Sequence, residues 1–165
     1  MALAVPINLR AYFPSRTLRN FISTVRPSID PRWGEYTFEE ILQQVRHYMQ
    51  LHIHRQELRA EFTGNVLFQT HPLLKKVPLV LKNPAMIFSY PGPFRVPREM
   101  ERHIHHMEVI LGQATQPKPN CATISYGNIM EITFAGTQKE TDTERDFFRF
   151  LVQQGLSVKI ESNRV

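Results

Sequence analysis

Residues 121–134 read CATISYGNIMEITF, and two alternating runs within this stretch decide the fold. In each run, apolar side chains alternate with small or polar ones, which is the period of a strand that buries one face. Gly127-Asn128 stands between the runs, and both residue types tolerate the positive φ angles of a two-residue turn. The stretch therefore predicts a β-hairpin with strands at 121–126 and 129–134.

The segment after the hairpin predicts a helix and a third strand. Thr141 and Glu144 have the spacing of a capping box, in which each side chain accepts a hydrogen bond from the other residue's backbone N–H. A stripe of large apolar residues follows and stops before Gly155, so we expect a helix over 142–154. Residues 156–161 alternate again and predict a strand. Such a unit buries one sheet face beneath one helix.

A second capping box, Thr37 with Glu40, opens the longest amphipathic pattern in the chain. Apolar residues recur there at steps of three and four, so we expect a helix over 38–62 that stops at Gly64. Weaker patterns predict two N-terminal strands. The first contains Pro6, so we expect either an edge strand or a strand that ends in a bend. The remaining weak patterns predict helical turns at 16–20, 79–83, 85–88 and 97–102 and a strand at 107–111.

Together these patterns predict an α/β (α+β) fold. We expect a two-layer sandwich in which helices pack on a mixed, mostly antiparallel sheet. A length of 165 residues suits one domain, so residues 1–165 are taken as a single domain.

Composition excludes several classes of protein. The formal net charge is +5, but the basic residues are scattered, and acidic residues interrupt the densest cluster, so we expect a solvated surface and no nucleic-acid partner. Cys121 is the one cysteine, which excludes an internal disulfide and a cysteine-rich zinc site. We expect a buried, inert thiol. No apolar run reaches the ~18 residues of a membrane span, so the predicted location is cytoplasmic.

No catalytic or metal-binding constellation stands out from the residues themselves. His52 and His54 point to different sides of a helix, and His105 and His106 are adjacent, so neither pair converges as a zinc site requires. We expect no metal. Neither a glycine-rich phosphate loop nor a Gly-x-Ser-x-Gly elbow is present.

Six stretches, taken in order, resemble the C-terminal half of alcohol acetyltransferase-like proteins, which belong to the chloramphenicol acetyltransferase-like superfamily together with the condensation domains of peptide synthetases. The resemblance spans nearly the whole chain, and the order of the stretches carries it. They are 5–10, 12–21, 36–41, 77–83, 124–126 with 129–134, and 147–148 with 158–163.

The resemblance implies an enzyme of two similar halves, with acyl donor and acceptor entering a tunnel between them. The catalytic His-His-x-x-x-Asp motif belongs to the N-terminal half, and its second histidine acts as the general base. His105-His106 begins like this motif, but Ile110 stands where the aspartate belongs. We therefore assign no catalytic residue within these 165 residues.

The resemblance also implies the partners and the site. This chain is expected to supply tunnel wall and substrate contacts, with acyl-CoA as co-substrate, a small alcohol as acceptor and an N-terminal catalytic half as partner. Each candidate also has a structural reading: the arginines as surface ion-pair formers, the asparagines as turn or cap residues, the last strand positions as ordinary. The candidates for lining the tunnel or the interface are Asn8, Arg10, Arg19, Asn20, Ser125, Tyr126 and Asn128.

One segment departs from the family pattern. Between residues 83 and 96 the family has a longer segment that ends in a Ser-Asn-Leu-Gly strand, whereas only Ser89–Phe94 remains here. Either the loop and strand are lost, or a stretch has been removed. The alternative to an acyltransferase half is a non-catalytic binding or self-associating module with an exposed apolar face. A nucleic-acid-binding domain, suggested only by the charge, is the weakest alternative.

Overall fold

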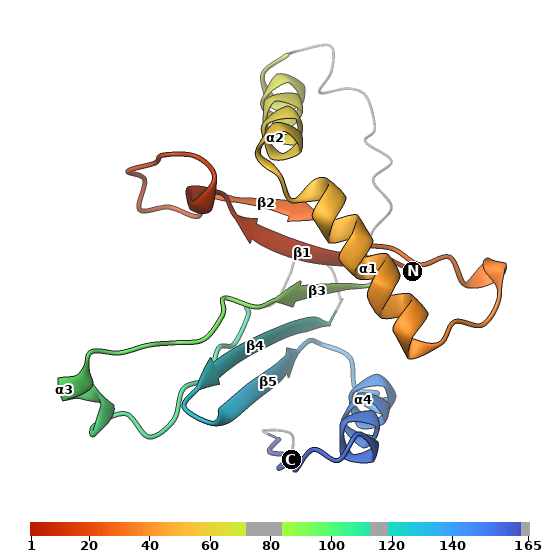
Figure 1. Ribbon diagram of the computed structural model, residues 1–165, viewed down its shortest axis with the longest axis vertical. Coiled ribbons are helices and arrows are strands. Elements are labelled where there is room, and N and C mark those ends of the chain that lie inside the picture. The colour runs from red at the N-terminus through yellow and green to blue at the C-terminus, as the bar shows by residue number, and fades with distance from the viewer. Residues whose placement is uncertain (72–83, 113–118, 163–165) are drawn as a thin grey trace.

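The computed structural model describes residues 1–71, 84–112 and 119–162. These residues form a five-stranded sheet in the order β2-β1-β3-β4-β5, accompanied by four α-helices (Figure 1). The strands are β1 (Leu3–Asn8), β2 (Ile22–Val25), β3 (Met86–Ser89), β4 (Asn120–Tyr126) and β5 (Ile129–Ala135). The helices are α1 (Phe38–His52), α2 (Arg55–Thr70), α3 (Arg98–Glu101) and α4 (Asp142–Gln153), with short 3-10 turns η1 (Leu9–Ala11) and η2 (Pro31–Trp33).

The sheet is mixed, as predicted. Strands β1, β3 and β4 run parallel to one another at its centre. Strands β2 and β5 lie at the two edges and pair antiparallel with β1 and β4, over more residues than the parallel pairs. Parallel neighbours require crossover connections, and β1, β3 and β4 are far apart in the chain. The carboxyl ends of β1, β3 and β4 therefore lie on the same side of the sheet, which is called the carboxyl edge of the sheet below.

The predicted hairpin is confirmed. Strands β4 and β5 pair from Tyr126↔Ile129 to Asn120↔Ala135, and Gly127 has φ 58° in the turn between them. The positive angle is one that glycine adopts at little cost. Phe134 of β5 meets two rings of α4 edge to face, with centroid distances of 5.5 Å and 5.8 Å, and this contact anchors the predicted helix beside the hairpin.

Strand β1 is an interior strand, so the first predicted alternative, an edge position, is wrong, whereas the second, a strand that ends in a bend, agrees with the turn η1 that follows Asn8. The backbone N–H groups of Leu3 and Leu9 donate at 3.0 Å to the carbonyls of Pro27 and Phe21, the residues that flank β2. N–H groups alternate in direction along a strand, so the backbone nitrogen of Pro6 points away from β2. Pairing of β1 with β3 ends at Ala4. The side of Pro6 that lacks an N–H therefore faces β3 at a position where β1 and β3 no longer pair. No hydrogen bond is lost there, so proline is tolerated in this interior strand.

A strand occupies the segment that was expected to be helical near residues 85–88. Strand β3 lies between β1 and β4, pairing parallel to both. Pro84 rules out a continuing helix, and the Met-Ile-Phe run that follows suits an extended strand covered on both faces. The segment Ser89–Phe94, where the family pattern is shorter here, follows directly after β3. The expected helix at 79–83 lies outside the described residues.

The predicted helix over 38–62 is two helices. Ile53 (φ −99°, ψ 62°) and His54 (φ −136°, ψ 160°) leave the helical region, and α2 begins at Arg55. Helix α2 then continues through Gly64, whose helical backbone needs no left-handed angle. A glycine inside a helix costs only about 1 kcal/mol, so Gly64 by itself is not enough to end α2.

Three predicted elements are absent from the described residues. The segments at 107–111 and 156–161 are extended without a strand partner, and 16–20 is not helical. Leu156 and Ile160 are 56% and 64% exposed. An alternating pattern shows only that one face of a segment is suited to burial. A strand also needs a neighbour for backbone hydrogen bonds, and no described strand pairs with either segment. The predicted turn of helix at 97–102 is confirmed as α3.

The two predicted capping boxes differ in outcome. At the start of α1, the Glu40 N–H donates to Thr37 Oγ1 at 3.3 Å, and the Thr37 N–H donates to Glu40 Oε2 at 2.8 Å. The carboxylate of Glu40 accepts from the Thr37 N–H and also, at 3.1 Å, from the Thr37 hydroxyl, and these two bonds lower the pKa of the Glu40 carboxyl. Thr141 precedes α4 with φ −119° and ψ 22°, and its side chain makes no capping hydrogen bond. The backbone angles at Thr141 explain the difference, because a cap residue normally adopts an extended ψ.

Thr37→Ala is expected to lower the free energy of unfolding by about 1 kcal/mol, because it leaves an N–H of the first turn of α1 without its acceptor. Thr141→Ala is the matched control and is expected to change it hardly at all. Urea denaturation followed by circular dichroism measures both. Equal losses for the two variants would contradict this account of the caps.

The buried core is small. Among the described residues, only Leu9 and Leu58 are large side chains with less than 2% exposure, and α1, α3 and α4 bury no residue completely. The chain exposes 13641 Å², whereas a compact monomer of its mass exposes about 8,500 Å². Many large apolar side chains are exposed, among them Leu18, Trp33 and Ile110. The fully buried apolar residues are Ala4, Leu9, Val25, Leu58, Cys121, Ala122 and Ile124.

Candidate functional site

The predicted site residues lie beyond the carboxyl ends of two parallel strands. Asn8 ends β1 and Tyr126 ends β4, while β3 lies between these strands and ends at Ser89. Because β1, β3 and β4 are parallel, their carboxyl ends share one edge of the sheet (Figure 1). The topology therefore gathers the candidates at a single edge in two groups, one in the loop after β1 and one at the tip of the β4–β5 hairpin.

The first group holds a loop closed. The backbone N–H of Arg10 donates to Asn8 Oδ1 at 3.1 Å, which caps η1. The guanidinium of Arg10 donates from Nη2 to the carbonyls of Thr17 and Arg19, at 2.8 Å and 2.6 Å. Asn8 and Arg10 thus have structural roles in this conformation. Arg19 and Asn20 are exposed on the same loop.

The second group lies at the hairpin tip. The Ser125 carbonyl accepts the backbone N–H of Phe94 at 2.7 Å, so the segment after β3 continues alongside β4. The side chains of Ser125 and Tyr126 are half-buried, and Asn128 is exposed in the turn. Of the predicted candidates, Tyr126 alone lines a hollow described below.

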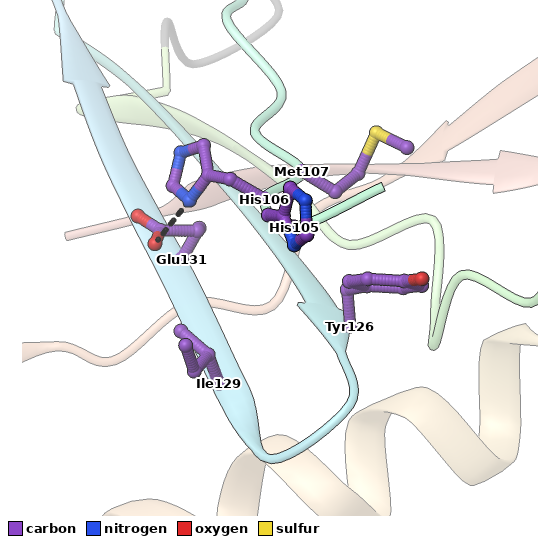
Figure 2. Close-up of a pocket in the computed structure, with 6 residues that line it drawn as sticks. All are labelled: His105, His106, Met107, Tyr126, Ile129 and Glu131. Atoms are coloured by element: carbon purple, nitrogen blue, oxygen red, sulfur yellow. Dashed lines mark ion pairs between the residues drawn. The ribbon is translucent and has the colours of Figure 1, made fainter. Parts of the chain in front are cut away.

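A small hollow lies beside the hairpin (Figure 2). Figure 2 shows His106 directed toward Glu131 of β5, with 3.5 Å between His106 Nδ1 and Glu131 Oε1. His105, Met107, Tyr126 and Ile129 complete the lining. The space measures about 10 Å³, enough for one water molecule at most.

The His106–Glu131 pair is too exposed to form an acid–base centre of its own. The side chains of His106 and Glu131 are 56% and 32% exposed, and exposed pairs of this kind contribute little stability. Lys159 and Glu161 form a further ion pair nearby at 2.5 Å. Glu161 has a lowered pKa, chiefly through its hydrogen bond with Lys159 and more weakly through His106. The cluster gathers surface charges and leaves no room for a substrate.

A larger hollow of about 180 Å³ lies where β2 meets α1 and α2. Sequence reasoning missed this site, apart from placing His52 on a helix. The only local signal is the four-residue spacing of Glu57 and Glu61, which puts both carboxylates on one face of α2. The break between α1 and α2 at Ile53 could not be read from the pattern, and that break creates the hollow.

Cys121 is buried in β4, as expected, at 2% exposure. Burial raises the pKa of its thiol to about 11. The fraction of nucleophilic thiolate at neutral pH is therefore very low, on the order of one part in ten thousand. Cys121 is a packing residue of the central sheet.

Two further properties concern the described part of the chain. No group of three or more histidine, cysteine, aspartate or glutamate side chains within it is arranged to hold a metal ion. None of its helices is long and apolar enough to cross a membrane. None of the family models, curated proteins or solved structures compared with this chain matches it.

Proposed function

We propose that this chain is the C-terminal half of an acyl-CoA-dependent O-acyltransferase of the chloramphenicol acetyltransferase-like kind. The observation that carries the proposal is the order of the six stretches in the sequence that resemble alcohol acetyltransferase-like proteins. The convergence of the predicted site residues at one sheet edge supports it, because ligands of open α/β sheets bind beyond the carboxyl ends of parallel strands.

In this proposal the general base comes from outside residues 1–165, which contain no His-His-x-x-x-Asp motif. The base removes the proton of the acceptor hydroxyl as the oxygen attacks the thioester carbonyl of acyl-CoA, and coenzyme A leaves as the thiol. Ser125, Tyr126 and Asn128 form one part of the tunnel wall, and Asn8, Arg10, Arg19 and Asn20 form another. Asn8 and Arg10 contribute by holding the shape of their loop, and the other five residues position the two substrates.

The exposed apolar surface supports the need for a partner half. Ile129 and Met130 at the start of β5 are 56% and 58% exposed, and the outer edge of β5 has no strand beside it within the described residues. Stable monomers rarely leave this much apolar surface uncovered. A second α/β half that covers this side completes the enzyme. Acyl-CoA and a reduced Cys121 fit a cytoplasmic setting.

The test is a complementation assay. The purified chain is mixed with the separately expressed N-terminal half of an alcohol acetyltransferase, and release of coenzyme A from acetyl-CoA is followed with a thiol reagent over a panel of alcohols. We expect turnover only in the mixture. Buried Cys121 adds little background to this assay.

The control mixture carries an N-terminal half whose second motif histidine is replaced by alanine, and it should show no turnover. Robust turnover by the chain alone would contradict the proposal that the general base comes from outside residues 1–165. Two folded halves that associate without activity would contradict acyl transfer.

The alternative is a non-catalytic module that self-associates through its apolar surface. The same exposed residues of β5 favour it. Sedimentation of the chain alone separates the two: a stable multimer that persists when the N-terminal half is added indicates the module, and a monomer that pairs with that half indicates the enzyme.

A further inference from the structure

The larger hollow between β2 and the two long helices is built from groups of opposite charge and a ring stack. It measures about 180 Å³, the space of roughly six water molecules. This size suits a single small metabolite better than a nucleotide. It is lined by Thr24, Val25, Arg26, Tyr48, His52, Glu57 and Glu61.

The side chain of Arg26 lines this hollow, and its hydrogen bonding is incomplete. Its Nε is enclosed by the protein and has no hydrogen-bond partner among the described residues, so a ligand in the hollow meets the terminal NH2 groups of the guanidinium. Buried charged donors are nearly always paired, because burial without a partner is costly. A planar carboxylate is the acceptor that matches a guanidinium best, since it receives two parallel N–H bonds.

Glu57 and Glu61 supply acceptors from α2, one helical turn apart. Glu61 is held in place because its Oε2 accepts the Ser23 hydroxyl at 2.9 Å. Glu57 is exposed at the rim. Two carboxylates facing one guanidinium disfavour a simple anion and favour a ligand that also carries a positive group, such as a primary ammonium.

Tyr48 and His52 supply a flat wall. Their rings lie at a centroid distance of 4.2 Å and an angle of 34°, one turn apart on α1. Stacked rings of this kind present an apolar face to a third ring or an aliphatic side chain.

We propose that this hollow binds a free α-amino acid with an aromatic side chain. The ligand carboxylate pairs with Arg26, its ammonium lies between Glu57 and Glu61, and its ring rests against Tyr48 and His52. This proposal does not depend on acyl transfer, and the hollow lies beside Val25 and Arg26, away from the edge of the sheet where β1 and β4 end.

Isothermal titration calorimetry with the whole chain tests the proposal. The probes are L-phenylalanine, 3-phenylpropanoate, which lacks the ammonium, and 2-phenylethylamine, which lacks the carboxylate. We expect each truncated probe to bind at least about tenfold more weakly than L-phenylalanine, because each leaves one charged wall unpaired.

Variants locate the binding. Arg26→Lys keeps the charge but removes the paired donors, and Glu57→Gln removes a charge at the exposed rim. Each variant should bind L-phenylalanine about tenfold more weakly than the wild type. Arg95→Gln, an exposed arginine outside the hollow, should leave binding unchanged. Near-ultraviolet circular dichroism verifies that each variant is folded.

Three results would overturn the proposal. The first is the absence of heat above dilution with L-phenylalanine at the limit of its solubility. The second is equal affinity for L-phenylalanine and 3-phenylpropanoate. The third is unchanged affinity in both folded variants, Arg26→Lys and Glu57→Gln.

Discussion

Leu58→Ala is expected to lower the free energy of unfolding by about 2–5 kcal/mol. Leu58 is 0% exposed and is the one helical side chain that is fully buried among the described residues. Its removal leaves a cavity where α2 approaches β2, and it discards apolar contacts that the rest of this small core cannot replace. Urea denaturation monitored at 222 nm, on the wild type and the variant in parallel, measures the loss.

Leu67→Ala on the same helix is the matched control. Leu67 is 53% exposed, and leucine and alanine have similar helix propensities, so we expect a change within about 0.5 kcal/mol. A loss for Leu58→Ala no larger than that for Leu67→Ala would contradict the burial of α2 against the sheet.

Ala122→Asp is expected to abolish cooperative folding. Ala122 is 1% exposed at the centre of β4, paired with Ser89 on one side and Thr133 on the other. An aspartate there buries an unpaired carboxylate in a site sized for a methyl group, which costs several kcal/mol out of a typical total of about 5–15 kcal/mol. We expect a chain without a sigmoidal urea transition and with weak near-ultraviolet circular dichroism.

Met130→Asp provides the contrast on the neighbouring strand. Met130 is 58% exposed on β5, so its aspartate remains hydrated, and we expect the variant to keep a cooperative transition. Loss of folding in Met130→Asp would show that the outer face of β5 is covered in solution, for example by a second copy of the chain. A folded Ala122→Asp variant would contradict the central position of β4.

The small core links these stability effects to the proposed function. In the part of the chain that the structure describes, Leu9 and Leu58 are the only large side chains buried to below 2% exposure, so each carries a large share of the stability. A half enzyme that normally packs against a second half shows this balance, because part of its apolar surface is reserved for the partner. The proposed pairing should therefore raise the stability of both halves, by mass action.

Local chemistry allowed some elements to be predicted well. The hairpin needs only two alternating runs and a turn sequence, and all of its determinants lie within fifteen residues. The cap of α1 likewise depends on Thr37 and Glu40 alone. The candidate residues near Asn8 and Tyr126 were named from the sequence, but their location at one edge of the sheet follows from the parallel pairing of β1, β3 and β4.

The sequence by itself determined the hairpin and the cap that starts α1, because in both cases neighbouring residues carry the whole cause. It also placed Cys121 in a strand, but the burial that keeps the thiol inert comes from the surrounding sheet. Tertiary structure alone decided the rest. It placed Pro6 inside the sheet, left residues 156–161 without a strand partner, and ended α1 at His52 so that Arg26, Glu57 and Glu61 line one hollow. Those outcomes depend on which segments become neighbours, and backbone pairing and burial between distant segments leave no short-range pattern in the chain.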